Sequence, residues 1–253
     1  MIKLMRPDKP KLLEENEKNL TEEYKKTGKS VWRKDYIVKP LMQMSHNKCC
    51  YCETNLTVQA RNMAVEHYHF KDGYPDEVVS WDNLLPSCSQ CNSNKGIYDT
   101  VKDGDIIKPT DDDPRDYLYL YCFMIKSKDN DLESKGRKTV ELLDLNNRDR
   151  LVTPRIKIAS AMDEKLQYIH KKMCAYAERQ DGKQYNRNRI VNGIIDLLKL
   201  AQPYAEYSAF ISTVLSESTD YKEIKKLMKK FDLWTPEMEK LHNTMITIKF
   251  DAR

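Results

Sequence analysis

Apolar residues recur at helical spacing through most of the second half of the chain. The pattern i, i+3, i+4, i+7, i+8 is complete in one segment, where it is formed by Tyr207, Phe210, Ile211, Val214 and Leu215. Further stripes run through residues 151–176, 190–198 and 221–231. These patterns predict a helical C-terminal region, in which 221–231 is the last helix.

The N-terminal part also carries a helical pattern. Apolar residues between positions 13 and 24 recur at helical spacing, and Gly28 ends the run. A second helix is expected over residues 36–44, interrupted or kinked near Pro40. We therefore expect a helical segment over residues 1–47.

The segment between these two regions is polar and has strand patterns. Residues 62–70 alternate in part between apolar and polar side chains, and residues 117–123 are rich in strand-forming types, so each predicts a short strand. A helix is expected to begin near Ser93, although Gly96 weakens it. The predicted fold class is mainly α with a small α+β centre. Its three parts are an N-terminal segment, a core and a mainly helical C-terminal region, over residues 1–47, 48–110 and 111–253.

Composition sets broad limits on function. The chain has 253 residues, a net charge of +4 and 32% charged residues, which permits nucleic-acid binding without requiring it. No stretch approaches the roughly 20 apolar residues of a membrane helix, and the N-terminus lacks the apolar stretch of a secretory signal. Seven cysteines, four of them in close pairs, favour the reducing cytoplasm over a disulfide scaffold.

The paired cysteines have the spacing of a metal site. Cys49-x-x-Cys52 and Cys88-x-x-Cys91 each place two thiolates on one tight turn, and two such turns complete a tetrahedral shell. The pattern predicts a structural zinc ion, which would also supply folding energy to a polar segment. Cys50 lies within the first pair and is a less well spaced substitute ligand.

A second group of candidate residues lies between and just after the cysteine pairs. Glu66 and His67 are adjacent, and Asn92 directly follows the last cysteine. A neutral histidine can take a proton from water, and carboxylate and amide oxygens suit magnesium or manganese. Neighbours on a strand point to opposite sides, so the two side chains would share a site only at a bend or a rim. Taken alone, the pair fits an exposed acid beside a partly buried histidine better, so the wider pattern decides.

That wider pattern resembles the HNH endonuclease family, also called the ββα-metal fold. Over residues 49–95 the chain reads Cys-x-x-Cys, Glu-His, Trp-x-Asn-Leu and Cys-x-x-Cys-Asn-x-x-Lys. The resemblance implies a β-hairpin crossed by a helix, built around one catalytic cation. The acid is glutamate where aspartate or histidine is commoner, and the proline often found shortly after the histidine is absent.

The resemblance also implies a role for each residue of the pattern. His67 corresponds to the general base, with Glu66 and Asn92 as ligands of the cation. Asn83 corresponds to the residue that orients the hairpin loop and the base, and Lys95 to a phosphate contact. His69 is either an extra ligand or phosphate contact, or a strand histidine that faces solvent.

A wider resemblance is to the HNH subunits of Septu-type anti-phage systems, which also occur linked to retrons. It rests on Ile2-Lys3, Arg6-Pro7, Thr21, Tyr24, Trp32, the segment 48–53, Leu145-Asn146 and Arg148. It implies a partner, an ABC/SMC-like ATPase. The chain itself has no Gly-x-x-x-x-Gly-Lys motif, so nucleotide hydrolysis would come from another chain.

The sequence thus favours a metal-dependent endonuclease in which His67 activates water, with DNA as the substrate. RNA stays open as a substrate, because this chemistry does not require deoxyribose. The alternatives are a non-catalytic zinc module that binds nucleic acid or protein, and an adaptor that holds the ATPase. The lysines between positions 222 and 230 fit a binding face or, more commonly, a solvated helix face.

Overall fold

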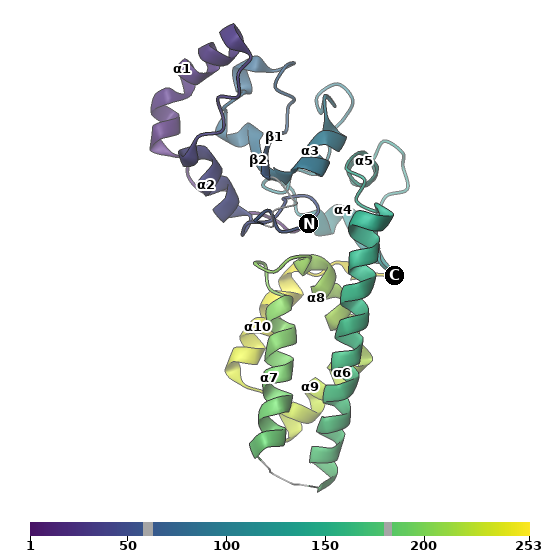
Figure 1. Cartoon of the computed structure of the whole chain (residues 1–253). Coiled ribbons are helices and arrows are strands. Elements are labelled where there is room, and N and C mark those ends of the chain that lie inside the picture. Colours follow the sequence, from purple (N-terminus) through teal and green to yellow (C-terminus); the bar gives the residue numbers. More distant parts are fainter. Residues whose placement is uncertain (58–62, 180–183) are drawn as a thin grey trace. The chain divides into compact units, whose positions relative to one another are not determined.

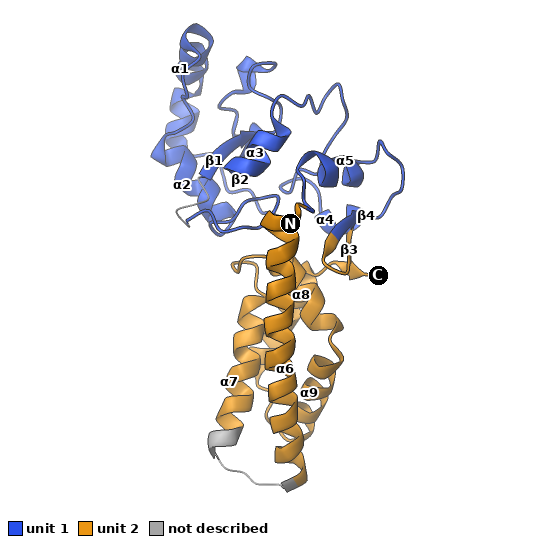
Figure 2. Ribbon diagram, turned by 45° about the vertical axis from the view of Figure 1, so that its right-hand side comes forward, with its two compact units in different colours: residues 1–118, 125–146 blue, residues 119–124, 147–253 orange. Residues whose placement is uncertain are grey.

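The computed structural model describes residues 1–57, 63–179 and 184–253 (Figure 1). The chain divides into two compact units, coloured separately in Figure 2. Unit 1 comprises residues 1–118 and 125–146, and unit 2 comprises residues 119–124 and 147–253. The described helices include none with the length and apolar character needed to cross a bilayer. The three-part division expected from the sequence stays a prediction.

Two helices open unit 1. Helix α1 (Lys11–Thr27) ends at Gly28, which has a φ of 65° and donates its N–H to the Tyr24 carbonyl at 2.8 Å. Helix α2 (Asp35–Met44) continues through Pro40 without interruption. Its apolar face is buried on both sides of the proline, and this burial outweighs the one backbone hydrogen bond that proline cannot make.

A two-stranded antiparallel sheet lies at the centre of unit 1. Strand β1 (Met63–His67) pairs with β2 (Leu84–Cys88), so that Glu66 lies opposite Leu85 and His67 opposite Leu84. A strand was expected over residues 62–70. Among the described residues it ends at His67, and position 62 lies outside the described residues. The loop between the strands contains two short 3-10 turns, η1 (Pro75–Glu77) and η2 (Trp81–Asn83).

Helix α3 (Ser89–Lys95) directly follows β2 and contacts both strands. The expected start near Ser93 was wrong. The helix begins four residues earlier, at Ser89, because the Cys88 side chain caps it there. Its Sγ accepts a hydrogen bond from the Cys91 N–H at 3.4 Å. Gly96 follows the last helical residue with a φ of 53°. The other elements of this region are α4 (Pro114–Tyr117), β4 (Met124–Ser127) and α5 (Lys135–Leu142).

Unit 2 is mainly helical. Its elements in chain order are β3 (Leu118–Tyr121), whose first residue belongs to unit 1, the π-helical turn η3 (Arg148–Val152), α6 (Thr153–Arg179), α7 (Gln184–Leu200), α8 (Ser208–Glu217), α9 (Thr219–Lys230), α10 (Pro236–Ile248) and β5 (Asp251–Ala252). Figure 1 shows α6 beside α7, and α6 also packs on α9 while α10 packs on α7 and α8. Strand β5 pairs in parallel with β3. A mainly helical chain with small sheets confirms the predicted class at this level.

The prediction that residues 221–231 form the last helix was wrong, because α10 follows. The Thr235 side chain caps α10 by accepting a hydrogen bond from the Met238 N–H, and Pro236 occupies the first helical position. A capping threonine followed by proline is a helix-start signal that the sequence contains. Apolar residues also recur at helical spacing in α10, at Met238, Leu241, Met245 and Ile248, and Met238 and Met245 are the buried ones.

Candidate active site and metal centre

The four paired cysteines meet inside unit 1. Their Sγ atoms all lie within 4.8 Å of one another, and all four residues are buried. Cys49 and Cys52 lie on a turn that precedes β1, Cys88 ends β2, and Cys91 lies in the first turn of α3. The cluster therefore joins a turn, a strand and a helix.

This geometry fits a tetrahedral zinc ion. Zinc–sulfur bonds of about 2.3 Å place neighbouring sulfurs about 3.8 Å apart, and the Sγ atoms of Cys52 and Cys88 are 3.8 Å apart. Cys50, the substitute ligand that the sequence left open, is not part of the cluster. Its N–H instead donates to the Pro86 carbonyl at 2.9 Å. A metal such as zinc would fix the end of β2 and the start of α3 against the turn.

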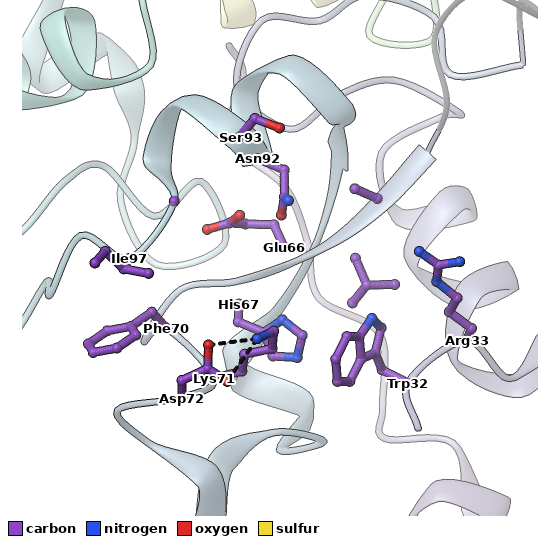
Figure 3. Close-up of a pocket in the computed structure, with 13 residues that line it drawn as sticks. Trp32, Arg33, Glu66, His67, Phe70, Lys71, Asp72, Asn92, Ser93 and Ile97 are labelled. Atoms are coloured by element: carbon purple, nitrogen blue, oxygen red, sulfur yellow. Dashed lines mark hydrogen bonds and ion pairs between the residues drawn. The ribbon is translucent and has the colours of Figure 1, made fainter. Parts of the chain in front are cut away.

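A cavity of about 320 Å³ runs along one edge of β1 (Figure 3). Residues 64–67 of β1 line it, whereas no residue of β2 does. Because β1 pairs with β2 along its other edge, side chains on both faces of β1 can reach the cavity. The remaining lining comes from residues 32–33, from the loop after β1 and from the α3 region.

Glu66 and Asn92 lie together on one side of β1 (Figure 3). The Glu66 side chain is buried, and its Oε1 accepts no well-aligned hydrogen bond from the described residues. Burial raises the pKa of Glu66 to about 7. The Asn92 amide is half-buried and has no hydrogen-bond partner among the described residues. One carboxylate and one amide oxygen thus face the same space, and both are hard ligands that suit magnesium or manganese.

His67 lies on the other side of β1, against Trp32 (Figure 3). Its Nε2 is 2.9 Å from the Val78 carbonyl oxygen. A carbonyl can only accept, so Nε2 carries the hydrogen and Nδ1 keeps its lone pair. Burial lowers the pKa of His67 to about 4, which leaves the ring neutral at pH 7. The Trp32 and His67 rings pack edge to face with centroids 4.6 Å apart.

Asn83 fixes the loop that supplies the Val78 carbonyl. Its Oδ1 accepts the His69 N–H at 2.7 Å, and its Nδ2 donates to the carbonyls of His69 and Glu77, each at 3.1 Å. These three bonds join the start of the loop to the residue before Val78. Asn83 therefore bonds to the residue that precedes the carbonyl partner of His67, and the orienting role that the resemblance implies for it stays a prediction.

Lys95 is held inside unit 1 beside the cavity. Its Nζ lies 3.0 Å from Glu66 Oε1 and donates to the His67 carbonyl at 2.8 Å. The residue is only 3% exposed and does not line the cavity. A phosphate contact, the role that the family resemblance implies for Lys95, would require the side chain to leave both partners. In the structure Lys95 is the counter-charge of Glu66, and its contact with a phosphate stays a prediction.

Replacing Lys95 with methionine is expected to lower the free energy of unfolding by about 3–5 kcal/mol, because the buried Glu66 carboxylate loses its partner. Urea unfolding of the full chain, followed by tryptophan fluorescence, measures this loss. The double variant Lys95→Met/Glu66→Gln should recover part of it. Lys39→Met is the control, since its pair with Asp35 is exposed and worth about 0.5 kcal/mol or less. Equal effects at positions 95 and 39 would contradict the buried pair.

The structure thus brings Glu66, His67 and Asn92 to one cavity and leaves His69 outside it. The His69 Nδ1 lies 2.6 Å from a carboxylate oxygen of Glu77. Sequence reasoning had not linked Trp32 to the imidazole, and nothing in the sequence could have identified a backbone carbonyl as its partner. Tryptophan next to an exposed arginine is a weak signal on its own.

Comparison with known proteins gives the chain its family. No protein-family model matches it. It is 40% identical to the Septu protein PtuB of Bacillus thuringiensis over 241 residues, which cover 95% of this chain and 92% of the relative. It is 26% identical to the Septu protein PtuB of Bacillus mycoides (strain KBAB4) over 226 residues, 73% of this chain and 75% of that protein. The Septu resemblance is thereby confirmed, and the chain belongs to the PtuB family of Septu proteins.

Proposed function

We propose that the chain is a metal-dependent HNH endonuclease that hydrolyses phosphodiester bonds, with DNA as the first candidate substrate. The observation that carries this proposal is the state of His67. It is a neutral imidazole, fixed through Nε2 to the Val78 carbonyl, in the same cavity as Glu66 and Asn92. Hydrolysis of a phosphodiester requires a positioned neutral base and hard oxygen ligands for a cation, and this one cavity is lined by both.

In this proposal His67 acts as the general base. Its Nδ1 takes a proton from a water molecule as the water oxygen attacks phosphorus. The Nε2–H bond to the Val78 carbonyl strengthens as the ring gains positive charge, since a charged donor forms a stronger hydrogen bond than a neutral one. Trp32 packs on the ring and limits its rotation. The proton therefore moves to an atom whose direction is set before the substrate binds.

Glu66 and Asn92 would hold the divalent cation. When bound, magnesium or manganese would neutralise a non-bridging phosphate oxygen and stabilise the departing 3′ oxygen. Glu66 is held in place through Lys95, which approaches its carboxylate at 3.0 Å. The Asn92 side chain needs to give up no hydrogen bond to a described residue in order to bind a cation. The donor set fits the proposed ion.

The physiological role that we infer is anti-phage defence in the cytoplasm. Membership of the PtuB family supports this role. The Septu resemblance further supports a hetero-oligomer with an ABC/SMC-like ATPase that controls when cleavage occurs. The helices of unit 2 are the proposed docking region for that subunit. Zinc in the four-cysteine cluster would have a structural role only.

The test is cleavage of supercoiled plasmid DNA and of single-stranded RNA by the full chain, purified alone and co-expressed with the proposed ATPase partner. We expect cleavage with magnesium or manganese and none with EDTA. Asn92→Ala should raise the cation concentration for half-maximal cleavage by about 10–100-fold. Asn94→Ala is the matched control on the same helix, because that amide bonds to the Leu143 carbonyl at 3.2 Å and does not line the cavity. A chain that cuts neither substrate with its partner present would overturn the proposal.

A further inference from the structure

A run of positive charge borders the candidate active site. Residues 25–34 contain five cations and no acid. They extend from the last turn of α1 to the residue before α2. The same segment contains Trp32, whose indole packs on His67. The run therefore reaches the proposed base directly.

Four of these five cations are exposed and have no carboxylate partner among the described residues. They are Lys26, Lys29, Arg33 and Lys34, and we refer to them as the basic connection. The fifth, Lys25, pairs with Asp76 and with Glu22. An exposed cation without an acid partner is free to neutralise the charge of another molecule.

Arg33 is the member of the basic connection that lines the cavity (Figure 3). The other lining cation, Lys71, is bound by both oxygens of Asp72 at 2.8 Å. Lys95 is buried against Glu66 and does not line the cavity. Arg33 is thus the lining cation, among the described residues, whose charge is not already compensated. A guanidinium presents parallel donors that match two phosphate oxygens.

We propose that the basic connection is a phosphate-binding surface that leads a nucleic-acid strand into the cavity. Arg33 contacts the phosphate nearest the cleaved bond, and Lys29 and Lys34 contact phosphates on either side along the strand. The proposal rests on the proposed nuclease function, and it assigns to Arg33 the contact that the family resemblance implied for Lys95. Phosphate contacts of this kind position the backbone without reading sequence.

The lysines of α9 are a less suitable surface for this purpose, although the sequence concentrates more of them there. Lys222 pairs with Glu217 at 3.3 Å and Lys229 with Glu239 at 3.2 Å. Lys225 lies over the Trp234 ring, 5.1 Å from its centroid. Two of the five α9 lysines are thus paired with acids, and a third packs on an aromatic ring. Lys226 is exposed and has no acid partner among the described residues, so it serves as a matched control.

Two measurements test the proposal. The first is kcat/KM for plasmid cleavage, which Arg33→Ala should lower by about 10–100-fold, the loss expected for a charged hydrogen bond. Arg33→Lys should fall between Arg33→Ala and the wild type, because it keeps the charge but loses the parallel donors. Lys226→Ala should match the wild type.

The second measurement is binding of a labelled DNA duplex and a labelled single strand over a range of salt concentrations, in the His67→Ala background. Each of Lys29→Ala, Arg33→Ala and Lys34→Ala should weaken binding, and each should reduce the salt slope by roughly 0.7–0.9, the value for one lost phosphate contact. Lys226→Ala should leave the slope unchanged.

The two measurements separate this inference from the nuclease proposal. If the wild type binds but does not cut, and the basic connection still sets the salt slope, the surface stands and the nuclease proposal fails. If the wild type cuts but Arg33→Ala equals Lys226→Ala in both measurements, the surface is wrong and the nuclease proposal stands. If the chain binds neither the duplex nor the single strand, the proposed phosphate-binding surface is also wrong.

Discussion

Cys91→Ser is expected to abolish zinc binding and to unfold the centre of unit 1. Cys91 is one of four buried cysteines whose Sγ atoms lie within 4.8 Å of one another, and serine cannot replace a thiolate ligand in a zinc shell. Four-cysteine zinc sites contribute on the order of 10 kcal/mol to folding. Metal analysis by mass spectrometry should find zinc bound to the wild type and none bound to the variant. Hydrogen exchange should show loss of protection in β1, β2 and α3.

Cys50→Ala is the matched control. Cys50 is as buried as the cluster members and lies between two of them in sequence, but its Sγ is outside the cluster. Its loss should cost about 1 kcal/mol, the typical effect of a single buried substitution, and should leave zinc bound. A Cys91→Ser chain that keeps its zinc and its exchange protection would show that the four thiolates are not a metal shell.

The sequence predicts the four-cysteine cluster well, because the spacing of the cysteines alone indicates it. Two thiolates three residues apart can reach one ion whatever the surrounding fold, so Cys49, Cys52, Cys88 and Cys91 could be grouped without knowing any strand. Helical periodicity was equally direct for α6 to α9. The same periodicity runs through α10, at Met238, Leu241, Met245 and Ile248, so the sequence contained the signal for this helix although the prediction left it out.

The site itself was predicted only in part, because it depends on which edge of β1 is free. Alternation places Glu66 and His67 on opposite sides of the strand, which argued against a common site unless it lay at a rim. The sequence does not indicate the partner strand β2, because Pro86 is unfavourable in a central strand and the segment has no alternating pattern. Only the pairing of β1 with β2 along one edge leaves the other edge open to both side chains.

The sequence also could not predict which way the side chain of Lys95 points. A lysine that follows a metal-binding cysteine pair can reach outward to a phosphate or inward to a carboxylate. Lys95 reaches inward, because α3 packs on β1 and its Nζ lies 3.0 Å from Glu66 Oε1 and 2.8 Å from the His67 carbonyl. Arg33 had no motif that pointed to it, and its relevance follows from Trp32 packing on His67.

His67→Ala is expected to lower kcat for cleavage by about 10²–10⁴-fold, which is the contribution of a positioned general base. Nucleic-acid binding should change little, because no phosphate contact is assigned to the imidazole. His69→Ala is the comparison two residues away, outside the cavity and paired with Glu77, and it should lose about 10-fold or less. Plasmid cleavage under conditions of saturating cation and substrate measures both variants.

Added imidazole distinguishes a lost base from a damaged fold. The space left by the His67 ring adjoins Trp32 and the Val78 carbonyl, so free imidazole can enter it and accept the proton. Cleavage by His67→Ala should then rise with imidazole concentration, whereas cleavage by Asn92→Ala, which lacks an oxygen ligand instead, should not. Equal losses at positions 67 and 69 without imidazole rescue would mean that the histidine supports the fold only. Rescue confined to position 67 would establish that proton transfer at this atom limits the reaction.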